Sequence, residues 1–182
     1  MSKIEVYMKR TIITFIFIFA GLSILNAQSL SIGPQVAYIK TSDAEKGVFM
    51  PAGAVRLNLG GLAIEGSIGY KSEEFANGVV KATSYPIMAT AMLKLLPLIH
   101  VEAGLGWYNT KIEYSGPLSA IPSETQKEVG YHAGAGIELD LGSALITGDL
   151  RYVIMGKIKD LKINNELKSD YIAIYGGLMF KL

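Results

Sequence analysis

The chain has 182 residues, half of them hydrophobic and 18% charged, with no cysteine and a formal net charge of +1. This length fits one domain, and the absence of cysteine excludes a lipoprotein. The near-neutral charge excludes the strongly basic surface that nucleic-acid binding requires, so no nucleic-acid partner is expected.

The N-terminus has the features of a secretory signal peptide. Two basic residues, Lys9 and Arg10, precede an apolar run that leads to the small residue Ala27. We predict cleavage after Ala27, which removes residues 1–27 and leaves residues 28–182 as the mature domain. A membrane anchor helix is the alternative, but the apolar run is shorter than the ~20 residues that span a bilayer.

Eight segments of the mature chain alternate between apolar residues and small or polar ones. In the clearest segment, the odd-numbered residues from Val129 to Leu141 are all apolar, whereas the even-numbered residues between them are small or polar. This period of two predicts strands with two unlike faces. The eight predicted strands are residues 30–40, 48–59, 62–71, 80–95, 99–110, 128–141, 144–155 and 171–182.

The connections between these segments are alternately short and long. Gly60-Gly61 suits a two-residue primed turn. Short turns at one end and long loops at the other are typical of outer-membrane barrels, with the loops outside the cell. We therefore predict an all-β fold, an eight-stranded antiparallel up-and-down transmembrane β-barrel. The other short connections are residues 96–98 and 142–143, and the long ones are residues 41–47, 72–79, 111–127 and 156–170.

A soluble, lipocalin-like barrel would show the same period of two. Three features favour the membrane barrel: the polar face is rich in small residues with few charges, a signal peptide is predicted, and seven outward aromatic residues fall at one level. Because these aromatics lie late in outward strands and early in returning ones, we expect them to form a girdle at the extracellular edge. They are Tyr38, Phe49, Tyr70, Tyr85, Trp107, Tyr131 and Tyr152.

The last predicted strand resembles the assembly signal of outer-membrane barrels through Tyr175, Gly177, Phe180 and the terminal Leu182. With this strand, the mature chain resembles the OmpA/OmpX-like eight-stranded barrels and the broad, porin-type family of outer-membrane β-barrel domains. The resemblance implies an outer-membrane location. It also implies contact with outer-membrane lipid, recognition by the barrel-assembly machinery and a monomeric state.

The tight turns predict which lumen residues face one another. Eight strands leave an interior that side chains fill, and charges there must pair because an unpaired buried charge is costly. Counting from the turns sets Arg56 opposite Glu65 and Lys94 opposite His100 and diagonal to Glu102. It also sets glycines opposite Asp149 and Arg151. We expect a structural polar network, with a proton or ion pathway as the alternative. Its members are Arg56, Glu65, Lys94, His100, Glu102, Glu138, Asp149 and Arg151.

No catalytic, cofactor or metal site is expected. His100 and His132 fall near opposite ends of their strands, too far apart to share one metal, and His100-Val101-Glu102 lacks the cysteine ligands of a zinc deaminase. Nearby glycines at positions 130, 134 and 136 alternate along a strand with no helix after them, so we interpret them as space for neighbouring side chains.

The long connections form the remaining functional surface. Residues 111–127 are unusually apolar for a loop, and residues 156–170 combine lysines with acidic residues around an Asn164-Asn165 turn that suggests a two-stranded ribbon. Either could bind an extracellular protein or another surface ligand. The leading hypothesis is a non-enzymatic barrel with a structural or surface-interaction role. The alternatives are a narrow conduit or small-ligand binder and, less favoured, a lipid-modifying enzyme.

Overall fold

The computed structural model describes residues 28–41, 46–75, 79–116, 119–155, 157–159, 166–168 and 170–182. The predicted signal peptide and its alternative, an anchor helix, lie outside the described residues. The described part of the chain contains no helix that is long and apolar enough to span a bilayer.

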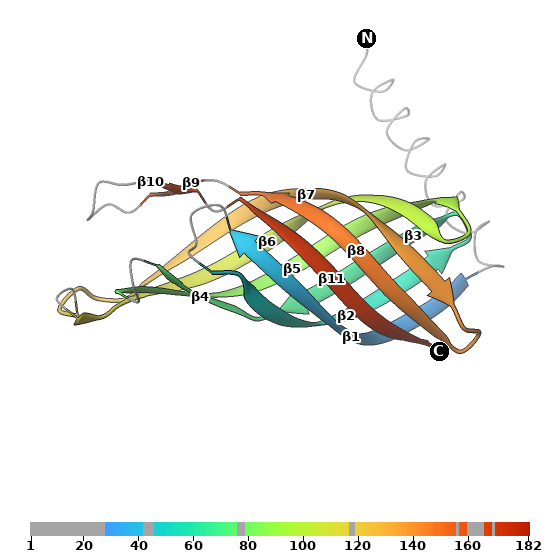
Figure 1. Ribbon diagram of the computed structural model, residues 1–182, viewed down its shortest axis with the longest axis horizontal. Helices are drawn as coiled ribbons and strands as arrows, with labels where there is room; N and C mark the ends of the chain where they lie inside the picture. The colour runs from blue at the N-terminus through green and yellow to red at the C-terminus, as the bar shows by residue number, and fades with distance from the viewer. Residues whose placement is uncertain are drawn as a thin grey trace, which may run out of the picture.

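The described chain folds almost entirely into antiparallel strands that wrap into a closed cylinder (Figure 1). Sequential strands are neighbours, and the last strand pairs with the first, as in an up-and-down barrel. The strands are β1 (Gln28–Thr41), β2 (Val48–Leu59), β3 (Leu62–Gly69), β4 (Lys71–Phe75), β5 (Val80–Leu96), β6 (Ile99–Tyr114), β7 (Glu124–Asp140), β8 (Ala144–Ile154), β9 (Lys157–Lys159), β10 (Glu166–Lys168) and β11 (Tyr171–Lys181).

Eight strand positions form the wall, because β3 and β4 are two parts of one strand. Both pair with β5 in one continuous register, from Leu62 opposite Leu93 to Phe75 opposite Val80, with an interruption at Tyr70. The remaining pair, β9 and β10, forms a separate ribbon beyond the loop end of the barrel (Figure 1). The predicted eight-stranded antiparallel barrel is confirmed.

The tight turns set the register that the sequence predicts. Leu59 lies opposite Leu62 and Arg56 opposite Glu65 across the turn at Gly60. Gly60 has φ 75°, in the left-handed region that a primed turn requires and that glycine enters without strain. Lys94 likewise lies opposite His100.

The strands at the loop end are longer than predicted, so the loops are shorter than expected. Residues 111–127 are not one loop, because β6 continues to Tyr114 and β7 begins at Glu124. The reason is that the alternation of inward and outward residues continues past Thr110. Ile112 is 5% exposed and faces inward, and its backbone pairs with β5 on one side and β7 on the other. β1 likewise reaches Thr41, and β4 occupies much of the expected loop at residues 72–79.

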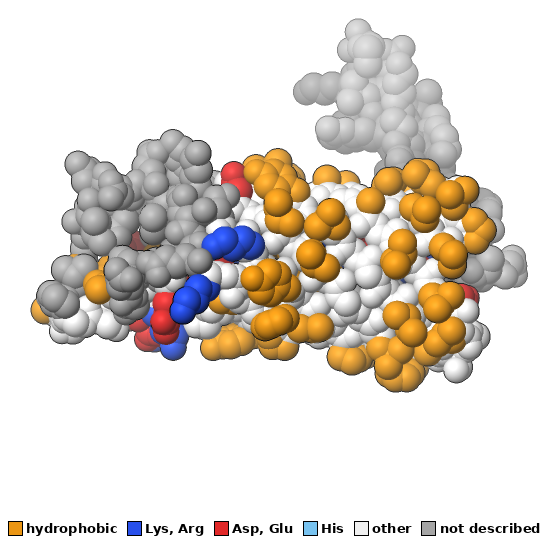
Figure 2. Space-filling model, viewed as in Figure 1, with side chains coloured by type: hydrophobic (Ala, Val, Ile, Leu, Met, Phe, Trp, Pro, Cys, Tyr) orange, Lys and Arg blue, Asp and Glu red, His pale blue; other side chains and the backbone are white. Residues whose placement is uncertain are grey.

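The outer wall carries the apolar residues of the alternation. Side chains such as Ile68 and Leu150 are more than half exposed, although they are large and hydrophobic. On the face shown in Figure 2, hydrophobic side chains are spread along the barrel wall, whereas most charged side chains gather near the end that carries the ribbon. An exposed apolar surface of this extent requires a lipid surround, and only closed barrels or helices satisfy the backbone there.

Candidate functional site: the barrel lumen

Ion pairs fill the part of the lumen nearer the tight turns, and Arg56 is one centre of them. Its guanidinium donates to Glu65 Oε2 from Nε at 3.0 Å and from Nη2 at 2.6 Å, and to Glu138 Oε2 from Nη1 at 2.6 Å. Lys94 donates to the other oxygen of Glu138 at 2.7 Å, and the Gln35 amide donates to Glu65 at 3.1 Å. Arg56 therefore links side chains from β1, β2, β3, β5 and β7.

Arg151 on β8 is the second centre. It donates to both carboxylate oxygens of Glu102, at 2.7 and 3.0 Å, and reaches Glu65 Oε1 at 3.3 Å. Its guanidinium carbon also lies 4.4 Å from the centroid of the Tyr175 ring. Because Glu65 binds both Arg56 and Arg151, the two centres belong to one network.

Two glycines on β7 allow side chains from β6 and β8 to meet. Gly136 lies between His100 and Asp149, and a Cβ there would stand 2.1 Å from Asp149 Oδ1 and 2.7 Å from His100 Nε2. Gly134 lies in the same way between Glu102 on β6 and Arg151 on β8, and a Cβ there would stand 2.9 Å from Glu102 Oε1. The prediction that these glycines make space for neighbouring side chains is confirmed.

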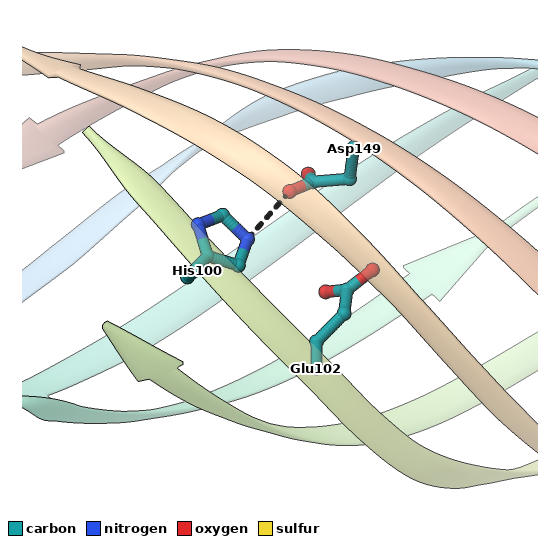
Figure 3. A group of neighbouring side chains, drawn as sticks. All are labelled: His100, Glu102 and Asp149. Carbon is teal, nitrogen blue, oxygen red and sulfur yellow. Dashed lines mark hydrogen bonds and ion pairs between the residues drawn. The ribbon is translucent and has the colours of Figure 1, made fainter. Parts of the chain in front are cut away.

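His100, Glu102 and Asp149 form the closest group of potential metal ligands among the described residues, with ligand atoms within 4.8 Å of one another (Figure 3). His100 Nε2 lies 2.8 Å from Asp149 Oδ1. Both Glu102 oxygens bind Arg151, however, so a cation would have to displace a guanidinium from its buried carboxylate. The geometry is that of an ion-pair network.

The charges of this network nearly balance. Three basic side chains, of Arg56, Lys94 and Arg151, face four acidic ones, of Glu65, Glu102, Glu138 and Asp149. The sum is one negative charge, and the His100–Asp149 contact becomes an ion pair only when His100 is protonated. All eight residues of the predicted network therefore face the lumen, and seven of them have fully or almost fully buried side chains. The exception is Lys94, whose side chain is 26% exposed.

The ion pairs are not all formed between neighbours in the register. Lys94 lies opposite His100 and diagonal to Glu102, as predicted, but its ammonium group binds Glu138 on β7. Glu102 binds Arg151 instead, across the gap left by Gly134.

The second histidine, His132, does not join this network. Its Nε2 lies 2.9 Å from Thr90 Oγ1, and its Nδ1 has no hydrogen-bond partner in the described part of the protein. The two histidines thus have separate partners. Both rings are buried in the lumen, away from the lipid-facing wall where a lipid substrate would lie.

The half of the lumen nearer the loops is mixed, because an apolar and aromatic cluster fills much of it beside a few polar residues, and the expectation of a polar lumen did not include this cluster. Inward positions near the loops carry large residues: Tyr108, Tyr171 and Tyr175 are each at most 2% exposed. The Tyr171 hydroxyl donates to the Tyr108 hydroxyl at 3.4 Å. We call this cluster the aromatic plug; its buried members are Ala37, Ile39, Met50, Met88, Tyr108, Val153, Tyr171, Ala173 and Tyr175.

A small polar cluster lies next to the aromatic plug and was missed by sequence reasoning. Lys71 Nζ lies 2.9 Å from Glu73 Oε2 and 4.7 Å from the centroid of the Tyr171 ring. Thr41 donates to Glu73 Oε1 at 2.6 Å. Thr41 and Glu73 fall in segments predicted as loops, and only continued alternation beyond residue 71 could have placed Glu73 inside.

The seven aromatic residues predicted as a girdle all lie on the outer wall. Tyr38 contacts Phe49 edge to face at a centroid distance of 5.3 Å, and Tyr70 contacts Tyr85 at 5.4 Å. Each of the seven is between 43% and 71% exposed: Tyr38, Phe49, Tyr70, Tyr85, Trp107, Tyr131 and Tyr152.

The residues proposed as an assembly signal lie on β11 or directly after it. Tyr175 is buried in the aromatic plug, whereas Phe180 and Leu182 are exposed on the outer wall at 49% and 78%. The amide of Leu182 donates to the carbonyl of Leu30, which ties the C-terminus to β1. Next to it, Lys181 binds Asp140 at 2.6 Å.

The loop end carries the strand extensions of β6 and β7 and the ribbon. The ribbon pairs Leu167 with Ile158, which confirms the two-stranded arrangement, and the predicted Asn164-Asn165 turn lies outside the described residues. On the exposed end of β6, a hydrogen bond from Lys111 lowers the pKa of Glu113. Lys111 on this end of β6 is exposed and binds Glu113, in contrast to the apolar wall below.

A closed eight-stranded barrel with an apolar exterior and a filled interior defines a class: the small transmembrane barrels of the outer-membrane type. No family model and no curated protein matches the chain. Solved structures of this class do match.

Among these structures is Neisserial surface protein A, at 14% identity and a TM-score of 0.62, covering 85% of this chain and 97% of that one. Another is a major outer membrane protein from Thermus thermophilus, at 11% identity and a TM-score of 0.63, covering 86% and 100%. A third is Ail, the attachment invasion locus protein of Yersinia pestis, in complex with the heparin analogue sucrose octasulfate, at 15% identity and a TM-score of 0.53, covering 85% and 97%. At these identities the likeness concerns the fold.

Proposed function

We propose that this protein is a closed, non-enzymatic barrel that supports the outer membrane or mediates surface interactions through its loop end. The observation that carries the proposal is the filled lumen. The ion-pair network occupies the half near the turns, and the aromatic plug occupies the half near the loops. No continuous pore is expected through two such layers.

Ion flow would require both layers to open. Separating a buried pair such as Arg56–Glu65 leaves an uncompensated charge, at a cost of about 3–5 kcal/mol. Arg56 and Arg151 both bind Glu65, so moving Glu65 away from Arg56 would also weaken its contact with Arg151. Moving Tyr171 or Tyr175 aside would also expose apolar surface inside the barrel.

Planar-bilayer recording tests the closed lumen. Folded, heat-modifiable monomer should give no steady conductance, only brief and small openings when a pair breaks. A steady, large conductance from the same preparation would overturn the proposal and favour the conduit. Ile174→Ala, on the outer wall, serves as a control that should behave as the unmodified protein does, because this residue is 59% exposed and faces away from the lumen.

A complementation experiment separates the two roles within the proposal. Cells lacking the protein should show increased sensitivity to detergent if the barrel supports the envelope, and the full chain should restore resistance. A variant in which residues 115–123 are replaced by a glycine-serine linker of equal length keeps the barrel strands. Rescue by this variant indicates a structural role, whereas failure despite normal insertion indicates a role for the loop end.

The expected partners follow from the same architecture. Outer-membrane lipid surrounds the apolar wall, and β11 is the segment offered to the barrel-assembly machinery. The monomer is the expected state, because closure of β1 on β11 leaves no free sheet edge in the wall. The alternative of a lipid-modifying enzyme predicts an altered lipid profile in a deletion strain, and an unchanged profile supports the non-enzymatic barrel.

A further inference from the structure

A groove crosses the outer wall over β1, β2, β3 and β5, with a volume of about 460 Å³. Its sides are the outward side chains of Ile32, Val55, Ile68 and Ile87, which are between 44% and 57% exposed. Between these side chains lie Gly53 and Gly66, which have no side chain to fill the groove.

The two glycines are not explained by packing. A Cβ built on Gly53 or on Gly66 meets no atom within 4 Å, and neither residue has a positive φ. Gly53 lies opposite Ile68, and Gly66 lies opposite Val55, so each glycine sits beside a branched apolar side chain. This contrasts with Gly134 and Gly136, where a Cβ would collide with a lumen side chain. A side chain added at Gly53 or Gly66 would therefore enter the groove and not the lumen.

The groove lies within the apolar belt. Gly53 is four residues from Phe49 of the girdle and Gly66 is four residues from Tyr70, while both are several residues from the turn at Gly60. At this level the surrounding medium is hydrocarbon. None of the residues that line the groove is charged, so nothing in it would bind a lipid headgroup.

We propose that this groove binds the acyl chain of a membrane lipid in a defined position. A second copy of the chain is a poorer occupant. The groove is lined by ten residues, whereas a stable protein interface uses about 20–30 residues on each side. An acyl chain needs only a narrow, apolar channel bordered by branched side chains.

The site can be mapped with the full mature barrel in phosphatidylcholine vesicles that contain a small fraction of phosphatidylcholine carrying a mid-chain diazirine. After irradiation, mass spectrometry should find severalfold more label on peptides that contain Val55 and Ile68 than on the opposite wall, at Leu150 and Ile174. Equal labelling around the barrel would overturn the proposal.

Filling the groove provides the second arm. The double variant Gly53→Leu with Gly66→Leu should reduce labelling of the groove to the level of the opposite wall. Gly176→Leu is the matched control, because its Cβ also meets no atom within 4 Å but it lies on β11, outside the groove. That variant should leave groove labelling unchanged. Unchanged groove labelling in a folded double variant would contradict the proposal, as would a protein dimer in the same vesicles whose interface contains β2 and β3.

Discussion

Gly136 shows at residue scale how a missing side chain organises the lumen. Its position on β7 lets His100 and Asp149 meet across the strand, at 2.8 Å. Gly136→Ala should destabilise the folded barrel by about 1–3 kcal/mol, because the new methyl group forces a buried polar contact apart. Reversible urea unfolding in detergent measures this difference.

The matched control for that substitution is Gly53→Ala on the outer wall. A Cβ there meets nothing within 4 Å, so the free energy of unfolding should stay within about 0.5 kcal/mol of the unmodified protein. Equal effects of the two substitutions would mean that the space beside Gly136 does not matter for the His100–Asp149 contact.

The Arg56–Glu65 pair permits a second measurement at this scale. Arg56→Met and Glu65→Gln, made singly and together, should be non-additive by about 0.5–3 kcal/mol, because the two side chains share hydrogen bonds at 2.6 and 3.0 Å. Unfolding in detergent gives the coupling. Arg56→Met combined with Glu113→Gln on the exposed end of β6 should be additive, and additivity of the Arg56–Glu65 cycle would show that the pair does not couple.

Within the predicted strands, alternation and turn position were sufficient to predict which residues face the lumen and which are opposite across a hairpin. The partner of Lys94 could not be predicted in this way. Its ammonium group reaches Glu138 two strands away, and that distance depends on how the strands are staggered around the barrel. Hairpin counting contains no information on contacts across the lumen, and the Arg151–Glu65 contact was missed for the same reason.

At the scale of elements, the loop ends of the strands were the least predictable. The sequence from Lys111 to Tyr114 contains both charged and apolar residues, which suit a loop as well as a strand. This segment is a strand because it pairs with β5 on one side and β7 on the other.

The aromatic plug was not predicted from the sequence. The outward face is also rich in aromatic residues, so a tyrosine at an inward position did not by itself indicate an aromatic cluster in the lumen.

The last strand carries a prediction about assembly. Phe180 is 49% exposed on the outer wall, so Phe180→Ala should change the free energy of unfolding little. If Phe180 is part of a recognition signal, the same substitution should lower the amount of folded protein in outer membranes. Heat-modifiability on gels reports the folded fraction in cells.

Ile174→Ala is the control on the same strand, because Ile174 is also exposed but lies nearer the loop end. It should not reduce assembly. If both variants lower the amount of folded protein equally, assembly depends on the apolar surface of β11 in general, and Phe180 has no special role.

At the scale of the whole molecule, the mature protein should begin at Gln28, since Ala27 is a small residue at the usual distance from the apolar run. Mass spectrometry of protein from purified outer membranes checks this boundary. An intact N-terminus in the inner-membrane fraction would instead support the anchor-helix alternative.

Trp107 is the single tryptophan of the sequence, and it is 48% exposed on the outer wall, among the residues predicted to form the aromatic girdle. The protein therefore has a natural fluorophore at the end of the barrel that must cross the bilayer during insertion. Its emission should shift to shorter wavelength as Trp107 passes from water into the membrane, so the spectrum of the unmodified chain can follow insertion in real time without any added label.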